Sequence, residues 1–260
     1  MTYKLGDKGD SVRMIQVALQ AAGYSVATDG VYGQQTVNAV KSFQIDSNLT
    51  FDGVAGPKTL AALFGVSISK GYINQHITRL AGRSVRYIAV HYTAGSSSRA
   101  GSAMAVRKVF MSRSASADFV VDDEQIVQIN PDLSGYYCWA VGDKKNISSG
   151  GGQLYGQATN RNTVSIEVCS NLAKQTSASM PNHSGWSFSD AALSHAVRLV
   201  RYLMVMYGIP KERVVRHYDI SGKLCPGIPG FNDGLLYTTS GSKTGKRNDS
   251  SKWIEFRNRI

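Results

Sequence analysis

The chain has 260 residues, of which 42% are hydrophobic and 18% are charged, so it can bury a normal core and is not disordered as a whole. No apolar run approaches the roughly 20 residues of a membrane-spanning helix. The first ten residues carry charges with no apolar segment behind them, and we expect neither a membrane span nor a secretory signal. Three cysteines cannot all pair, which favours free or metal-bound thiols over a disulfide scaffold.

The net charge of +11 is unevenly distributed. Residues 1–66 contain five Lys/Arg and five Asp/Glu, so all of the net charge belongs to residues 67–260. A basic second part beside a neutral first part predicts an anionic partner. Nucleic acid, anionic lipid and anionic cell-wall or outer-membrane polymers all satisfy this expectation, and the charge alone does not choose between them.

Residues 29–37 and 52–60 repeat one pattern, Asp-Gly-Val-x-Gly-x-x-Thr followed by an apolar residue. The Asp-Gly pair is a turn signal, and the second glycine precedes a helix start, where Pro57 suits the first helical position. Apolar residues at helical spacing predict three short helices around these turns. Their core residues are expected to be Val12, Ile15, Leu19 and Ala22, then Val37, Val40 and Phe43, and finally Leu60, Leu63 and Phe64.

The segment 5–65 carries further motifs besides the repeat, among them Leu-Gly-Asp-Lys-Gly-Asp-Ser-Val at 5–12, Gly-Tyr at 23–24 and Phe-Gln at 43–44. With these motifs it resembles the peptidoglycan-binding module of many cell-wall hydrolases. The resemblance implies that residues 1–65 anchor the protein to peptidoglycan. It does not indicate which residues contact the glycan or the peptide, and the Asp-Gly positions have either a contact role or a purely conformational one.

Residues 66–80 are expected to be a linker or lead-in, and residues 81–260 a second domain. Residues 86–93 form the pattern of a buried strand that ends near His91, and functional side chains often lie where a strand gives way to a loop. His91 is either a metal ligand or a core histidine. A helix over 103–111 follows, and then a hairpin over 119–129 whose acidic turn is expected to be solvated rather than a metal site.

Glu167 interrupts the apolar pattern of a strand over 163–169, which is costly unless the carboxyl is exposed or paired. It is therefore either a proton acceptor that faces a groove or a surface residue. Trp139 precedes a Gly/Ser/Asn-rich stretch, 145–162, that is expected to line a substrate groove. Its ring either stacks on a sugar or belongs to the core.

A helix from Ser189, as N-cap, to Tyr207 is expected to contain His195 as a structural residue. The run 238–252 is expected to be a mobile loop, and 253–256 a short closing helix.

An apolar strand before His217 leads into a short loop that carries Lys223 and Cys225. Imidazole and thiolate together suit Zn²⁺ among the common metals. A catalytic zinc ion keeps three protein ligands and leaves one position open. Two ligands lie in this stretch, and His91 is the natural third.

Residues 84–260 resemble a zinc-dependent N-acetylmuramoyl-L-alanine amidase of the type-2 family, which shares its fold with peptidoglycan recognition proteins. The matching pieces are 89–93, 115–122, 139–143, 162–169 and 217–226. The resemblance implies an α/β domain, a mixed central β-sheet flanked by helices, which here follows a small three-helix all-α domain. It further implies Zn²⁺ bound by His91, His217 and Cys225, catalysis by Glu167 and Lys223, and substrate contacts at Tyr92, Thr93 and Trp139.

The activity that this resemblance implies is hydrolysis of the amide bond between N-acetylmuramic acid and L-alanine, which lyses the bacterial cell wall. A binding module with a wall amidase and no signal peptide is similar to a bacteriophage endolysin. We then expect a monomer that stays in the host cytoplasm until lysis and acts afterwards on the wall. Two positions depart from many relatives, because Ala140 and Asp118 stand where those have histidines.

Three other functions are compatible with parts of the sequence. The first is a non-catalytic peptidoglycan recognition protein, although such relatives commonly lack the cysteine found here as Cys225. The second is a nucleic-acid binder, suggested only by the charge and opposed by the absence of any recognisable nucleic-acid motif. The third is a wall enzyme that cuts another bond, such as a peptide cross-link.

Overall fold

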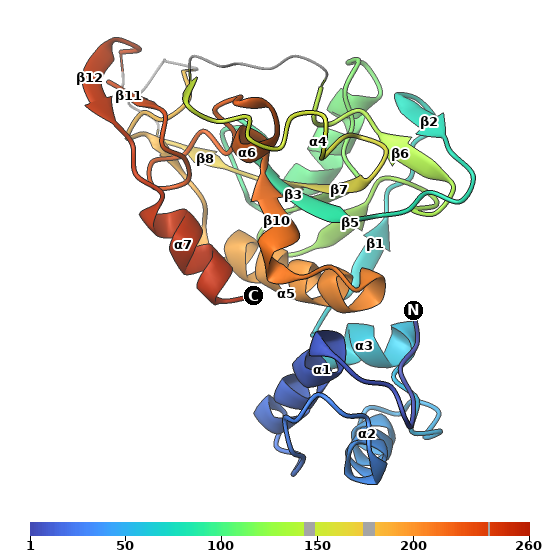
Figure 1. Ribbon diagram of the computed structural model, residues 1–260. Coiled ribbons are helices and arrows are strands. Elements are labelled where there is room, and N and C mark those ends of the chain that lie inside the picture. The colour runs from blue at the N-terminus through green and yellow to red at the C-terminus, as the bar shows by residue number, and fades with distance from the viewer. Residues whose placement is uncertain (143–148, 174–179, 239) are drawn as a thin grey trace. The chain divides into compact units, whose positions relative to one another are not determined.

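The computed structural model describes residues 1–142, 149–173, 180–238 and 240–260. The chain divides into two compact units, one of residues 1–67 with 198–211 and one of residues 68–197 with 212–260 (Figure 1). No helix of the described residues combines the length and the apolar character that crossing a membrane requires.

The first unit contains the three short helices that the sequence predicts. They are α1 (Asp10–Ala21), α2 (Gln34–Asp46) and α3 (Pro57–Leu63). Each follows a glycine at its N-cap, and Pro57 is the first residue of α3. Val12, Ile15, Leu19, Val40 and Leu60 are fully buried and form the core of this small domain. Phe43 and Phe64 are buried as well, whereas Ala22 is exposed and Val37 and Leu63 are only half-buried.

The internal repeat has a structural cause, a buried glutamine that closes each Asp-Gly turn. In the first copy the Gln16 side-chain amide donates to Asp29 Oδ1 at 2.8 Å and accepts the Gly30 N–H at 2.8 Å. In the second copy Gln44 donates to Asp52 Oδ1 at 2.9 Å and accepts the Gly53 N–H at 2.9 Å.

Both turn glycines have a positive φ, 75° at Gly30 and 76° at Gly53, which is the left-handed conformation that glycine favours. Gly30 and Gly53 thus have a conformational role in their turns.

The second unit is built on a six-stranded mixed sheet in the order β1-β5-β4-β7-β3-β10. Its strands are β1 (Ile68–Lys70), β3 (Tyr87–Tyr92), β4 (Phe119–Val121), β5 (Ile126–Gln128), β7 (Thr163–Val168) and β10 (Val214–Arg216). Strands β4, β7, β3 and β10 run parallel, with β10 at the edge of the sheet, whereas β4 and β5 form the antiparallel hairpin that the sequence predicts. Parallel central strands are buried on both faces, which explains their near-continuous apolar sequences.

Helices and short ribbons complete this unit. They are β2 (Ile77–Arg79), α4 (Ser102–Phe110), β6 (Tyr136–Cys138), β8 (Asn171–Leu172), β9 (Trp186–Ser187), α5 (Asp190–Tyr207, whose residues from 198 belong to the first unit), the 3₁₀ turn Lys211–Arg213, α6 (His217–Ser221), β11 (Leu235–Tyr237), β12 (Lys243–Arg247) and α7 (Ser251–Asn258). Ala103 and Phe110 of α4 pack with Val120 and Val127 of the sheet in one apolar cluster. Ser189 receives a hydrogen bond from the Ala192 N–H at 3.1 Å, which confirms it as a cap of α5.

Asp118, one of the two positions that depart from the family pattern, is a buried structural residue. Its carboxylate forms an ion pair with Arg83 at 3.0 Å and accepts hydrogen bonds from Asn130 Nδ2 at 2.7 Å and the Ser165 N–H at 2.8 Å. A buried carboxylate is tolerated when it is paired and hydrogen-bonded in this way. Asp118 therefore ties the hairpin to β7 and lies outside the metal-ligand set.

Three sequence-based expectations about loops differ from the structure. Residues 68–70 and 77–79, inside the expected linker 66–80, form β1 and β2. The acidic turn after β4 is not wholly solvated, because Asp122 is buried and accepts the Ala103 N–H at 2.9 Å at the start of α4. The run 238–252, expected to be a mobile loop, contains β12, which pairs with β11. Residues 253–256, expected to be helical, lie in α7.

Candidate metal centre

The candidate site lies at the carboxyl ends of three parallel strands, β3, β7 and β10. The register pairs His91 of β3 with Glu167 of β7, and Arg216, the last residue of β10, with Val90. His217 follows directly as the first residue of α6. Ligands of open α/β sheets bind beyond the carboxyl ends of the strands. The topology thus places His91, Glu167 and His217 at the carboxyl ends of the strands, where a site is expected.

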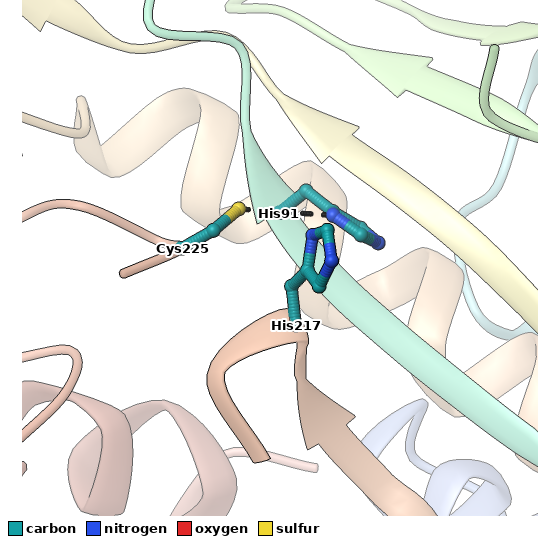
Figure 2. Close-up of side chains that lie close together, drawn as sticks. All are labelled: His91, His217 and Cys225. Atoms are coloured by element: carbon teal, nitrogen blue, oxygen red, sulfur yellow. Dashed lines mark hydrogen bonds between the residues drawn. The ribbon is translucent and has the colours of Figure 1, made fainter. Parts of the chain in front are cut away.

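Cys225 completes a cluster with the two histidines, as Figure 2 shows. The three residues are buried, and their candidate ligand atoms lie within 4.8 Å of one another. His91 Nδ1 is 3.7 Å from Cys225 Sγ, and the two imidazole rings have centroids 4.8 Å apart. Ligands on a tetrahedral zinc ion would have a nitrogen–sulfur separation of about 3.6 Å. The arrangement is therefore close to the size of a shared metal site.

Hydrogen bonding indicates which atom of His217 faces the cluster centre. His217 Nε2 lies 2.9 Å from the Val141 carbonyl oxygen, which can only accept, so Nε2 carries the proton. His217 Nδ1 is then an unprotonated acceptor, and it is buried without a hydrogen-bond partner among the described residues. Metal-ligating histidines commonly donate their other N–H to a carbonyl or carboxylate. The unsatisfied nitrogen fits a metal ligand.

Burial determines the protonation of the three side chains. It lowers the pKa of His91 well below its usual value and that of His217 to about 4, and the charge of Lys223 acts in the same direction on both. Burial raises the pKa of Cys225 to about 12. Both imidazoles are thus neutral, as ligands must be, whereas the thiol needs a nearby cation to ionise. Two neutral imidazoles and a thiol that a cation would ionise form a donor set that suits Zn²⁺.

Glu167 lies beside His91 in the sheet, and its Oε2 is buried without a hydrogen-bond partner among the described residues. β7 is an inner strand of the sheet, so Glu167 does not lie on an edge strand, and its side chain is half-buried. Burial raises the pKa of its carboxyl to about 8, and the charge of Lys223 opposes that rise. A divalent cation at the adjacent cluster would act in the same direction as Lys223. It would lower the pKa of Glu167 and favour the carboxylate.

Lys223 is exposed and lies in the loop between α6 and Cys225. Its ammonium is close enough to shift the pKa values of His217, Glu167 and Cys225 by its charge. Among the described residues, no hydrogen bond or ion pair joins its ammonium to these three side chains. The flexible four-carbon side chain of Lys223 lies at the rim of the site. It can therefore move its ammonium toward an anionic group when one is present.

Tyr92, one of the three expected substrate contacts, forms part of the wall of the site. Its ring packs edge-to-face on Trp186 with centroids 5.6 Å apart, and burial raises the pKa of its hydroxyl. Trp186 stands alone in a polar segment, so no sequence pattern marks it as part of a site.

Thr93 has a structural role in this arrangement, because its Oγ1 accepts the Gly95 and Ser170 N–H groups, each at 3.2 Å.

Trp139 is 39% exposed, so it is not a core residue. Its Nε1 donates to Thr78 Oγ1 at 2.8 Å, and its ring lies 5.5 Å from that of His76. No described contact joins it to the two histidines and the cysteine. Part of the expected groove-lining stretch, residues 145–148, lies outside the described residues. Val141, within the matching piece 139–143, acts through its backbone carbonyl, which orients His217 and which no side-chain pattern marks.

Comparison with known proteins adds family relationships to this geometry. The N-acetylmuramoyl-L-alanine amidase family matches residues 81–228, and the putative peptidoglycan binding domain family matches residues 8–63. N-acetylmuramoyl-L-alanine amidase CwlH of Bacillus subtilis is 36% identical over 142 residues, which cover 54% of this chain and 46% of that protein.

Two further relatives are N-acetylmuramoyl-L-alanine amidase CwlM of Mycobacterium tuberculosis and the catalytic domain of XlyA. CwlM is 43% identical over 60 residues, or 23% of this chain and 15% of CwlM. The solved XlyA domain has a TM-score of 0.51 and 25% identity, covering 75% of this chain and 99% of that one. The chain spans about half or less of the length of these curated relatives. Because the amidase match covers more than half of its residues, the chain belongs to the N-acetylmuramoyl-L-alanine amidase family.

Proposed function

We propose that the protein is a zinc-dependent peptidoglycan amidase that cleaves the bond between N-acetylmuramic acid and L-alanine. The observation that carries the proposal is the set of His91, His217 and Cys225 with Glu167 beside it at the carboxyl edge of the sheet. Membership of the amidase family supports the bond cleaved. A non-catalytic recognition protein would have no need of an unsatisfied buried carboxyl beside a complete donor set.

Zn²⁺ held by the three side chains would supply Lewis-acid polarisation of the amide carbonyl and would activate water at neutral pH. Glu167 then takes the proton of the attacking water at its free Oε2 and returns it to the departing amine of L-alanine. Such general acid–base work contributes typically about 10²–10⁴-fold to the rate. A raised carboxyl pKa suits both halves of this task, because the group must accept a proton and later release it.

Lys223 provides the positive charge at the rim of the site. Its ammonium already acts electrostatically on His217, Glu167 and Cys225. As negative charge develops on the carbonyl oxygen, an adjacent cation stabilises it. The Val141 carbonyl keeps His217 in the tautomer that ligation needs.

We propose that residues 1–65 hold the enzyme on its polymeric substrate as the binding domain, and that the catalytic domain comprises residues 81–260 together with β1 and β2 of the expected linker. The match of residues 8–63 to a peptidoglycan-binding family supports this division. Tethering raises the effective concentration of the second binding event, so a module of modest affinity suffices. The proposed setting is that of an endolysin, made in the host cytoplasm and acting as a monomer on the wall after release.

The bond that is cut can be identified from the products. Digestion of purified peptidoglycan should release intact stem peptides with a free L-alanine amino terminus and leave unsubstituted lactyl groups on the glycan. Mass spectrometry of the soluble fragments distinguishes these from the products of cross-link cleavage. Fragments in which only a cross-bridge is cut would overturn the assignment and favour a wall peptidase.

An anionic wall polymer is proposed as a second partner of the basic catalytic part. β12 is exposed along its whole length and carries Lys243, Lys246 and Arg247. Replacing Lys243 and Lys246 by glutamine should weaken binding to purified poly(glycerol phosphate) by about 2- to 30-fold, the range for two exposed ion pairs. The loss should shrink at high salt, where the attraction is screened. Co-sedimentation or calorimetry at two salt concentrations measures both effects.

The matched control replaces two exposed lysines at another place in the same unit, Lys70 and Lys108, by glutamine. It removes the same net charge and should change the affinity much less. Equal losses in both double variants would show that the attraction depends on net charge and not on β12. A gel shift with DNA under the same conditions tests the nucleic-acid alternative.

A further inference from the structure

The loop that carries Cys225 is held by residues that follow it in the chain. The match to the amidase family ends at residue 228, and β11, β12 and α7 come after that point. We propose that Asn232, at the start of this last segment, is a positioning residue for the metal centre. It acts by fixing the peptide on which Cys225 is carried. The inference rests on the proposed metal site and adds to it a residue outside the family match.

Asn232 is fully buried and uses its whole side-chain amide. Its Nδ2 donates to the Pro226 carbonyl at 2.7 Å and to Asn182 Oδ1 at 2.7 Å. Its Oδ1 accepts from Asn182 Nδ2 at 2.7 Å and from the Gly234 N–H at 2.9 Å. Pro226 follows Cys225 directly, so the first of these bonds restrains the residue next to the sulfur ligand.

Asn182 restrains the next residue of the loop, Gly227. Its backbone N–H donates to the Gly227 carbonyl at 2.7 Å. Its φ of +61° lies in the left-handed region, which asparagine tolerates better than most residues. The Asn232 side-chain amide and the Asn182 backbone N–H therefore hold two consecutive carbonyls, those of Pro226 and Gly227.

The other side of Cys225 is restrained by packing. A Cβ placed on Gly234 would lie 2.2 Å from Leu224 Cδ2, so the segment after Asn232 lies directly against the residue before Cys225. The loop is thus held at Leu224, Pro226 and Gly227, on both sides of the sulfur ligand. Ligand groups held in this way need less ordering when a metal binds, which raises metal affinity.

A purely structural role would have a different signature from a positioning role. Loss of a buried amide lowers the stability of the fold wherever it occurs. Loss of a positioning amide also weakens metal binding by the protein that remains folded. Asn130 allows the comparison, because it too is fully buried, donates to Asp118 Oδ1 at 2.7 Å and to the Tyr136 carbonyl at 3.0 Å, and accepts the Asp132 N–H at 3.1 Å.

The experiment measures the zinc affinity of the full chain by competition with a chromophoric chelator, with circular dichroism to verify folding. Asn232→Ala should weaken zinc binding by about 10- to 100-fold, the usual cost of removing an outer-shell partner. Asn232→Asp keeps the shape but cannot donate to the Pro226 carbonyl, and it should show a loss in the same range. The control Asn130→Ala should lose thermal stability and keep its zinc affinity within about twofold. The absorption of the Co²⁺-loaded protein, which reports the thiolate ligand, should change in the Asn232 variants alone.

The outcomes separate this inference from the proposed function. A wild-type protein that binds no zinc would remove the metal site, and the role of Asn232 with it. Wild-type binding with unchanged affinity in both Asn232 variants would overturn the positioning role and leave the metal site intact. Equal losses of affinity in Asn130→Ala and the Asn232 variants would show a general effect of stability and would also overturn it.

Discussion

Replacing Glu167 by glutamine is expected to reduce the turnover number by about 10²–10⁴-fold, the contribution typical of a general acid–base group. Glutamine keeps the size and the hydrogen-bonding shape of the side chain but cannot take a proton from water. The carboxyl is free to act because its Oε2 is buried without a partner among the described residues. Release of stem peptides from purified peptidoglycan, followed over time, gives the rate.

Zinc binding separates this effect from damage to the site. Glu167 is not one of the three clustered ligand residues, so Glu167→Gln should retain the zinc content of the wild type. Glu212→Gln, at an exposed glutamate in the 3₁₀ turn before β10, is the matched control and should keep full activity. Wild-type turnover in Glu167→Gln would remove the carboxyl from the mechanism, whatever the metal content.

Replacing Cys225 by alanine should weaken zinc binding strongly and abolish activity. One of three protein ligands is lost, and structural zinc sites with four ligands bind with about 10–16 kcal/mol in total. The affinity is therefore expected to fall by about 10²–10³-fold. At one equivalent of added zinc, stem-peptide release should be undetectable. Titration against a competing chelator measures the affinity.

Cys169 provides the control for this substitution, because it is a second buried free cysteine that is not in the ligand cluster. Cys169→Ala creates a small cavity and should lower stability while its zinc affinity stays unchanged. If Cys225→Ala bound zinc as tightly as Cys169→Ala, the sulfur could not be a ligand.

Local patterns in the sequence predicted the elements that carry the site. The apolar runs before His91 and His217 form β3 and β10, and the interrupted run around Glu167 forms β7. Continuous or alternating apolar residues are signals that short windows contain. The resemblance then named the residues, and the structure places His91, His217 and Cys225 together, although their roles stay predictions.

Pairing between distant residues could not be predicted in this way. Asp118 seemed only a departure from a family pattern, because its partner Arg83 lies 35 residues away. Asp122 seemed part of a solvated turn, because the N–H it accepts belongs to a helix earlier in the chain. Asn182 and Asn232 are 50 residues apart in polar segments that carry no periodic signal. Buried polar residues of this kind depend on the tertiary fold for their partners.

The central claim is that two imidazoles and one thiolate hold a single zinc ion. Native mass spectrometry of the purified wild-type chain, before and after chelation and after return of zinc, tests it most directly. We expect one zinc ion per chain, loss of the ion together with stem-peptide release on chelation, and recovery of both when zinc is returned. Full activity in a chain that carries no metal, or tight zinc binding in a variant that lacks His91, His217 and Cys225, would contradict it.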